Sequence, residues 1–226
     1  KKIFVSYKEL EGIHSKYNNK IFEIGNVVRE DIINTKIDRA KNKNFDEFKI
    51  LVLGGSQAAK VFADKLPKIF EKLKNSNIPI KVYQQCQNKQ NEQLSEFYKT
   101  KKIDYEIFNF TNNIVDYYYK ANLVITRSGA SVLGELINIK IPFICIPLPT
   151  SADNHQYKNA FYYKEKGFGY LINEKDINAQ LYDLIESIFK DNSLIKRILL
   201  NQRQYSDKNI FKNINTHIEK IINEKN

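Results

Sequence analysis

Several residue types that help to classify a protein are scarce in this sequence. Methionine and tryptophan are absent from its 226 residues, and the chain begins with Lys1. A complete translation product carries a starting methionine unless processing removes it, so we expect this chain to be part of a longer protein. Only two cysteines occur, Cys86 and Cys145, and they lack the spacing of a metal site or a disulfide framework. We predict that both are buried, reduced thiols, as in a cytosolic protein.

Long apolar runs and basic clusters are also missing. The longest apolar run, residues 141–149, is broken by prolines and is far too short to span a bilayer. The three histidines, His14, His155 and His217, are dispersed, so we expect no metal site. A formal net charge of +10 would suit nucleic acid, anionic lipid or a phosphorylated substrate. Because the lysines are scattered and no run of five basic residues occurs, a nucleic-acid-binding arm is not expected.

Short apolar segments alternate with helical patterns along most of the chain. This alternation predicts an α/β fold, a Rossmann-like doubly wound parallel sheet in which ligands bind beyond the carboxyl ends of the strands. A polar stretch over residues 34–48 is interpreted as a helix end and a linker. The predicted strands are residues 2–6, 20–24, 49–53, 78–86, 104–110, 122–130 (with its turn), 142–149 and 168–172. The predicted helices include residues 58–74, 91–101, 112–121, 131–139, 154–167 and 208–222.

Two of the predicted strands end on small-residue turns. In "GGSQAA", residues 54–59, the glycines allow a tight turn, and the following helix offers unpaired N–H groups to which Ser56 adds a hydroxyl. This pattern fits a phosphate site or an ordinary turn capped by Ser56. In "TRSGASVLGEL", residues 126–136, Glu135 would accept hydrogen bonds from vicinal hydroxyls. The alternative is an exposed carboxylate in the first turn of the helix, stabilised by the helix dipole. For Arg127, a surface salt bridge is the default interpretation, with a loop contact or a phosphate contact as alternatives.

Two further segments supply polar groups. The loop "PLPTSADNHQYKNA", residues 147–160, includes His155 and Gln156, which are suited to reading a sugar, although helix capping by Asp153 or Asn154 is the alternative. "GNVVRED", residues 25–31, places Arg29 after a strand end, where it would bind a diphosphate or form a surface ion pair. Together, the two turns, a carboxylate, a polar loop and an arginine are what a uridine diphosphate sugar would use.

The segments "GNVVRED", "LGGSQAA", "ITRSGASVLGEL" and "PFICIPLPTSADNHQYKNA", in this order, resemble the MurG family of bacterial UDP-N-acetylglucosamine transferases. The resemblance covers nearly the whole chain. It implies the C-terminal, donor-binding domain of a B-type glycosyltransferase fold, with the N-terminal domain missing from this sequence. The domains implied are residues 1–24 as the end of the N-terminal domain and the connection, 25–206 as the UDP-sugar-binding domain, and 207–226 as a C-terminal helix.

The resemblance also implies roles for individual residues, without any cofactor or metal. Arg29 and Ser56 would contact the diphosphate, the backbone at Thr111 would meet the uracil, and Glu135 would hold the ribose hydroxyls. His155 and Gln156 would contact the N-acetylglucosamine. The segment 130–135 would border the nucleotide and sugar; its residues are Ala130, Ser131, Val132, Leu133, Gly134 and Glu135. No residue of this chain is a convincing catalytic base, which the resemblance implies to lie in the missing domain.

The reaction implied is the inverting transfer of N-acetylglucosamine from its UDP donor to lipid I, an undecaprenyl-diphosphate-linked muramoyl peptide, which forms lipid II in peptidoglycan synthesis. The location implied is the cytoplasmic face of the inner membrane, where the enzyme would be peripheral and meet an anionic surface. Three alternatives stay open. They are another B-type glycosyltransferase or a UDP-N-acetylglucosamine epimerase, a catalytically incomplete UDP-sugar-binding remnant or subunit that needs a separate N-terminal partner, and a basic nucleic-acid module.

Overall fold

The computed structural model describes residues 2–7, 12–34 and 46–223, and most of the helix end and linker predicted over residues 34–48 lies outside these ranges. Within them, six strands form one all-parallel sheet in the order β5-β4-β3-β6-β7-β8. The sheet therefore confirms the predicted doubly wound parallel architecture. Its strands are β3 (Phe48–Leu53), β4 (Ile80–Gln85), β5 (Asp104–Phe108), β6 (Leu123–Thr126), β7 (Phe143–Cys145) and β8 (Tyr170–Leu171).

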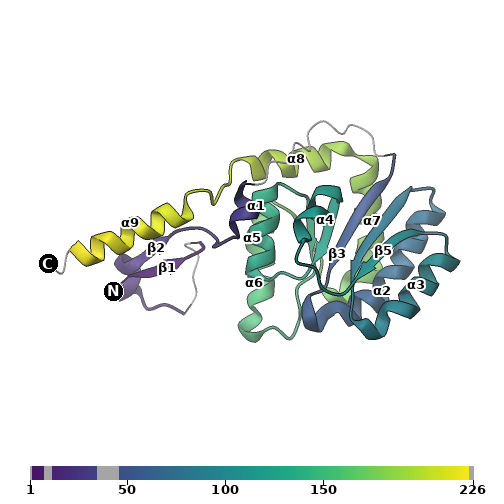
Figure 1. Cartoon of the computed structure of the whole chain (residues 1–226), viewed down its shortest axis with the longest axis horizontal. Coiled ribbons are helices and arrows are strands. Elements are labelled where there is room, and N and C mark those ends of the chain that lie inside the picture. The colour runs from purple at the N-terminus through teal and green to yellow at the C-terminus, as the bar shows by residue number, and fades with distance from the viewer. Residues whose placement is uncertain (1, 8–11, 35–45, 224–226) are drawn as a thin grey trace.

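Helices cover both faces of this sheet (Figure 1). One apolar layer is formed with α2 (Gly55–Asn75), α3 (Asn91–Thr100), α7 (Ile177–Lys190) and α8 (Asn192–Arg203). The opposite layer is formed with α1 (Glu30–Asn34), α4 (Ile114–Lys120), α5 (Ala130–Ile139) and α6 (His155–Glu165). Because both faces are covered, the central strands are almost continuously apolar and buried, as five of the six residues of β3 show. Short 3₁₀ segments complete this part, namely η3 (Asn88–Gln90), η4 (Ala152–Asn154) and η5 (Glu174–Asp176).

The two cysteines belong to this core. Cys145 lies in β7 and Cys86 follows β4, and both are buried free thiols, as predicted. Burial raises the pKa of the Cys145 thiol to about 12. No helix among the residues described combines the length and apolar character that crossing a bilayer requires.

A second, smaller unit is built from the two ends of the chain. Strands β1 (Ile3–Val5) and β2 (Ile21–Glu23) pair in parallel, with η1 (Ser15–Lys20) between them, and α9 (Ile210–Asn223) lies against them (Figure 1). The ring of His217 on α9 lies 5.7 Å from the ring of Phe4 and 4.6 Å from that of Phe22, measured between centroids. The first two strands predicted from sequence therefore exist, but they stand apart from the main sheet.

The chain passes between the two units twice, and one buried carboxylate joins the two passages. Asp207, on the passage from α8 to α9, accepts hydrogen bonds from the backbone N–H of Asn26 at 3.0 Å and from Asn138 Nδ2 at 2.7 Å. Asn26 lies on the passage from β2 to α1, and Asn138 lies on α5. Gly25, which precedes Asn26, has φ +90°, and a Cβ at this position would come within 2.1 Å of Asp207 Oδ1. The crossing is thus closely packed and has no room for a side chain at residue 25.

Candidate functional site

A cavity of about 410 Å³ opens at the carboxyl ends of the parallel strands. From β3 the chain winds outward through β4 and β5, then returns to pair β6 on the other side of β3, so β3 and β6 flank the topological switch point. The cavity lies at the ends of these two strands, where the sequence predicted a ligand. It is lined by Leu53, Gly54, Gly55, Gln85, Phe108, Phe110, Thr111, Ile114, Thr126, Arg127, Gly129, Val132, Leu148 and Gln156.

The first wall is the glycine turn between β3 and α2. Gly55 has φ +64°, a left-handed conformation that L side chains rarely adopt, and α2 begins at this residue rather than at residue 58 as predicted. The N–H of Gly55 donates to Gln85 Oε1 at 3.3 Å, and Gln85 Nε2 donates to the carbonyl of Asn109 at 3.3 Å. Gln85 thereby joins this turn to the loop after β5. Ser56 lies in the first turn of α2, but its side chain lies outside what the structure describes.

The second wall is the turn from β6 into α5, where Gly129 is the N-cap residue. Ala130 and Ser131 are exposed, and Val132 lines the cavity. Leu133 is fully buried in the core. Gly134 faces inward as well, since a Cβ on it would come within 2.9 Å of Asn26. Of the predicted segment 130–135, Val132 alone is among the residues that line the cavity, while Leu133 and Gly134 face the core.

Glu135 and Arg29, predicted to bind ribose and diphosphate respectively, lie next to each other. Arg29 Nε is 3.4 Å from Glu135 Oε1, and the Tyr118 hydroxyl donates to Glu135 Oε2 at 2.8 Å. Burial raises the pKa of Tyr118 well above its usual value, and the neighbouring Glu135 carboxylate adds to this effect, so Tyr118 remains a donor at neutral pH. The hydrogen bond from the buried Tyr118 hydroxyl thus fixes the position of the Glu135 carboxylate. Neither Glu135 nor Arg29 is among the residues that line the cavity.

Gln156 and His155 are adjacent at the start of α6 but face different spaces. Gln156 lines the cavity, and its Oε1 accepts hydrogen bonds from the N–H of Leu148 at 3.0 Å and of Ser128 at 3.3 Å. His155 is exposed, its Nδ1 lies 2.8 Å from the carbonyl of Ala152, and it lines a separate cavity of about 730 Å³ on α6. Consecutive helical residues point about 100° apart, which accounts for the division.

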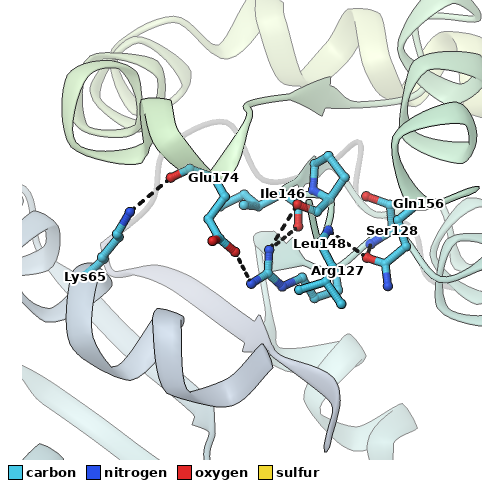
Figure 2. Close-up of polar contacts among 8 residues, drawn as sticks. Lys65, Arg127, Ser128, Ile146, Leu148, Gln156 and Glu174 are labelled. Carbon is cyan, nitrogen blue, oxygen red and sulfur yellow. Dashed lines mark hydrogen bonds and ion pairs between the residues drawn. The ribbon is translucent and has the colours of Figure 1, made fainter. Parts of the chain in front are cut away.

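Phe110, Gln85 and Arg127 are among the residues that line the cavity and that were missed or misinterpreted from sequence. Phe110 is 80% exposed at the rim, beside the predicted Thr111. An aromatic residue directly after a strand, within a polar loop, was the available signal. Gln85 on β4 was missed as well. The surface salt bridge favoured for Arg127 was wrong, since this residue is 5% exposed; it forms a buried pair with Glu174 and, as in the alternative of a loop contact, binds the carbonyls of Ile146 and Pro147 (Figure 2).

A doubly wound parallel sheet with a cavity at its switch point, framed by two glycine turns that lead into helices, defines an α/β domain of the Rossmann-like class. The sequence model of the "Glycosyltransferase family 28 C-terminal domain" matches residues 49–218. The chain belongs to this family, whose C-terminal domain it carries.

A curated relative from Pelagibacter ubique (strain HTCC1062) is 36% identical over 228 residues. It is named UDP-N-acetylglucosamine--N-acetylmuramyl-(pentapeptide) pyrophosphoryl-undecaprenol N-acetylglucosamine transferase. The alignment covers 99% of this chain but 62% of the relative, so the chain spans less than two thirds of that protein's length.

Solved structures share the fold. The crystal structure of Acinetobacter baumannii MurG superposes with a TM-score of 0.72 at 22% identity, covering 84% of this chain and 55% of that one. The co-structure of S. aureus MnaA with UDP superposes with a TM-score of 0.64 at 16% identity, covering 92% of this chain and 56% of that one. These likenesses show that the chain has the architecture of the C-terminal part of a B-type glycosyltransferase fold.

Proposed function

We propose that this chain is the donor-binding half of a UDP-N-acetylglucosamine transferase that converts lipid I to lipid II in peptidoglycan synthesis. The observation that carries the proposal is the cavity at the β3/β6 switch point, which glycine turns and Gln156 enclose within a family 28 domain. The similarity to the Pelagibacter ubique transferase supports the choice of donor and acceptor.

In this proposal the nucleotide lies across the cavity from the β5–α4 loop to α2. The uracil would stack on the exposed ring of Phe110 and meet the backbone of Thr111, whose side chain is already used, since Thr111 Oγ1 accepts from the N–H of Asn113 at 3.0 Å. The diphosphate would face the N–H groups at the start of α2, with Ser56 and Arg29. A ribose would compete with Arg29 for the Glu135 carboxylate, and the displaced guanidinium, whose Nε also lies 3.7 Å from Asp31 Oδ1, would then turn toward the phosphates.

The reaction would be a direct displacement that inverts the anomeric carbon. Departure of UDP places negative charge on the diphosphate, which the N-terminus of α2 and the Arg29 guanidinium would stabilise. The base that takes the acceptor proton would come from an N-terminal domain, as would most of the contact with lipid I. The whole enzyme would be peripheral at the cytoplasmic face of the inner membrane.

Isothermal titration calorimetry of this chain with UDP tests the nucleotide site. Replacing Phe110 with alanine should weaken UDP binding roughly tenfold, because stacking of a base on an aromatic ring contributes about 1–3 kcal/mol. Phe211→Ala, which removes an exposed ring on α9, is the matched control and should leave the affinity unchanged. If the chain fails to bind UDP, or if both variants bind like the unaltered chain, the proposed site is wrong.

The catalytic part of the proposal needs a separate assay. Transfer to lipid I should be absent or very slow with this chain alone and should appear when an N-terminal domain from a related transferase is added. If UDP binds but no such addition yields transfer, the chain is a UDP-sugar-binding remnant instead.

A further inference from the structure

Arg127 forms a buried clamp beneath the candidate site. Its Nη1 donates to the carbonyl of Ile146 at 3.0 Å and to that of Pro147 at 3.1 Å, and its Nη2 donates to the carboxylate of Glu174 (Figure 2). Both side chains of this ion pair are largely buried, with 6% exposure for Arg127 and 20% for Glu174. One guanidinium thus fixes the end of β6, the segment after β7 and η5 relative to one another.

The clamp extends to α2. The guanidinium carbon of Arg127 lies 4.7 Å from the centre of the Phe62 ring, and Lys65 Nζ donates to the backbone carbonyl of Glu174 at 3.2 Å (Figure 2). Removing two charges from water is costly, and apolar side chains of similar volume commonly hold a core together as well or better. A buried pair that makes four polar contacts and one cation–π contact beside a cavity therefore indicates a need for fixed geometry rather than for stability alone.

What the clamp fixes is the donor pair that orients Gln156. Leu148 follows the two carbonyls held by Arg127, and Ser128 follows Arg127 itself. The N–H groups of Leu148 and Ser128 both donate to Gln156 Oε1, and in Figure 2 the amide nitrogen points away from these two donors. With its oxygen occupied in this way, Gln156 can offer a ligand in the cavity its two Nε2 hydrogens.

We infer that Arg127 and Glu174 are positioning residues that set the Gln156 amide for the sugar half of a nucleotide-sugar ligand. The inference rests on the proposed function, which places a UDP-sugar in this cavity. The clamp acts on Gln156 through the segment 146–148. Within the described part of the chain it reaches α2 at Phe62 and Lys65, beyond the first turn at Gly55, and Phe110 is not among its contacts. Loss of the clamp should therefore weaken recognition of the sugar while leaving recognition of UDP nearly unchanged.

The experiment measures dissociation constants for UDP and for UDP-N-acetylglucosamine and uses their ratio as the readout. Gln156→Ala defines the ratio without the amide. Arg127→Lys keeps the positive charge but loses the planar guanidinium that donates to two carbonyls and to Glu174 at once. Glu174→Gln removes the negative charge of the carboxylate and keeps its shape. Both should shift the ratio toward that of Gln156→Ala, by roughly tenfold if one good hydrogen bond is lost, with the UDP constant within about twofold of normal. Glu186→Gln, which breaks the exposed pair with Lys190, is the matched control and should change neither constant.

Each contrary outcome has a distinct meaning. If Glu174→Gln, shown to be folded by its circular dichroism and melting curve, weakens both ligands equally or neither, the clamp has no positioning role. If Gln156→Ala leaves the ratio unchanged, the inference is also overturned. Adding Glu174→Gln to Gln156→Ala should cause no further loss, and an additive loss would contradict the inference. If the unaltered chain binds neither ligand, it is the proposed function that fails.

Discussion

Gly134 carries no side chain at the point where α5 packs on the segment after β2. A Cβ at this position would lie 2.9 Å from Asn26 Cβ and 3.2 Å from Val28 Cγ2, and both neighbours are buried. Neither can move away easily, since Asn26 is hydrogen-bonded to Asp207 and Val28 lies in the core beside α5. The glycine is therefore required by close packing.

We predict that Gly134→Ala lowers the free energy of unfolding by about 1–3 kcal/mol, the usual cost of overpacking, despite the better helix propensity of alanine. Urea denaturation would measure the loss. Gly129→Ala is the control, because the nearest atom to a Cβ there is 3.9 Å away, and its effect should be much smaller. Equal losses in the two variants would show that packing at Gly134 is not the cause.

The residue types and their positions along the sequence predicted part of the candidate site. Gln156 and Thr111 do line the cavity, and Arg29 and Glu135 do come together. Arg127 shows why the rest was out of reach. Its carboxylate partner is 47 residues away, and its carbonyl partners lie beyond another strand, so no local pattern marks it as buried. The binding roles of the predicted residues remain predictions.

At the scale of elements, the passages between the two units depend on few contacts. Asp207 is 4% exposed and accepts hydrogen bonds from the Asn26 N–H, the Asn138 amide and, at 2.9 Å, the Tyr205 hydroxyl. These partners come from both passages and from α5. Removing the carboxylate leaves buried donors without an acceptor, which costs more than the hydrogen bonds themselves contribute.

We expect Asp207→Ala to lower the free energy of unfolding by about 2–4 kcal/mol, on the grounds that several buried donors lose one charged acceptor. The matched control is Asp191→Ala. Asp191 caps α8 through one exposed bond to the Ser193 N–H at 2.8 Å, so its loss should cost about 1 kcal/mol. Chemical denaturation of both variants checks the difference. A loss for Asp207→Ala no larger than that for Asp191→Ala would contradict the importance of this crossing.

Apolar runs and turn residues predicted every strand of the main sheet and nearly every helix that covers it. The strands were visible because parallel strands buried on both faces produce continuous apolar segments. The start of α2 was placed too late, since a glycine with positive φ looks like loop and yet begins the helix. The resemblance placed residues 1–24 outside the UDP-sugar-binding domain, but nothing in the sequence indicated that β1 and β2 form a sheet of their own with α9 packed on it. Their sheet is covered by α9 from the other end of the chain, and pairing over such a distance leaves no local signal.

On the scale of the whole molecule, charge is the property that sequence gives directly. The formal net charge is +10, without a basic stripe in the sequence. Diffuse positive charge acts over the Debye length and weakens as salt shortens that length. Such a molecule should associate with an anionic bilayer mainly at low ionic strength.

We predict that the chain cosediments with vesicles containing phosphatidylglycerol, and that raising the salt from about 50 mM to about 500 mM lowers the bound fraction at least several-fold. Vesicles of phosphatidylcholine alone are the control and should bind little at either salt concentration. Equal binding to both vesicle types, or binding that salt does not weaken, would show that electrostatic attraction is not responsible.

The paired passages at Gly25 and Asp207 also restrict how the small unit can move. Because both passages are joined at the Asp207 carboxylate, one can shift along the other only if these hydrogen bonds break. The segment after β1 adds a separate contact, because the ring of Tyr7 stacks on that of Tyr162 on α6 with 4.4 Å between the ring centroids. Any rotation of the small unit against the main sheet would therefore have to separate these two rings and change the backbone torsions of the few residues around Gly25 and Asp207.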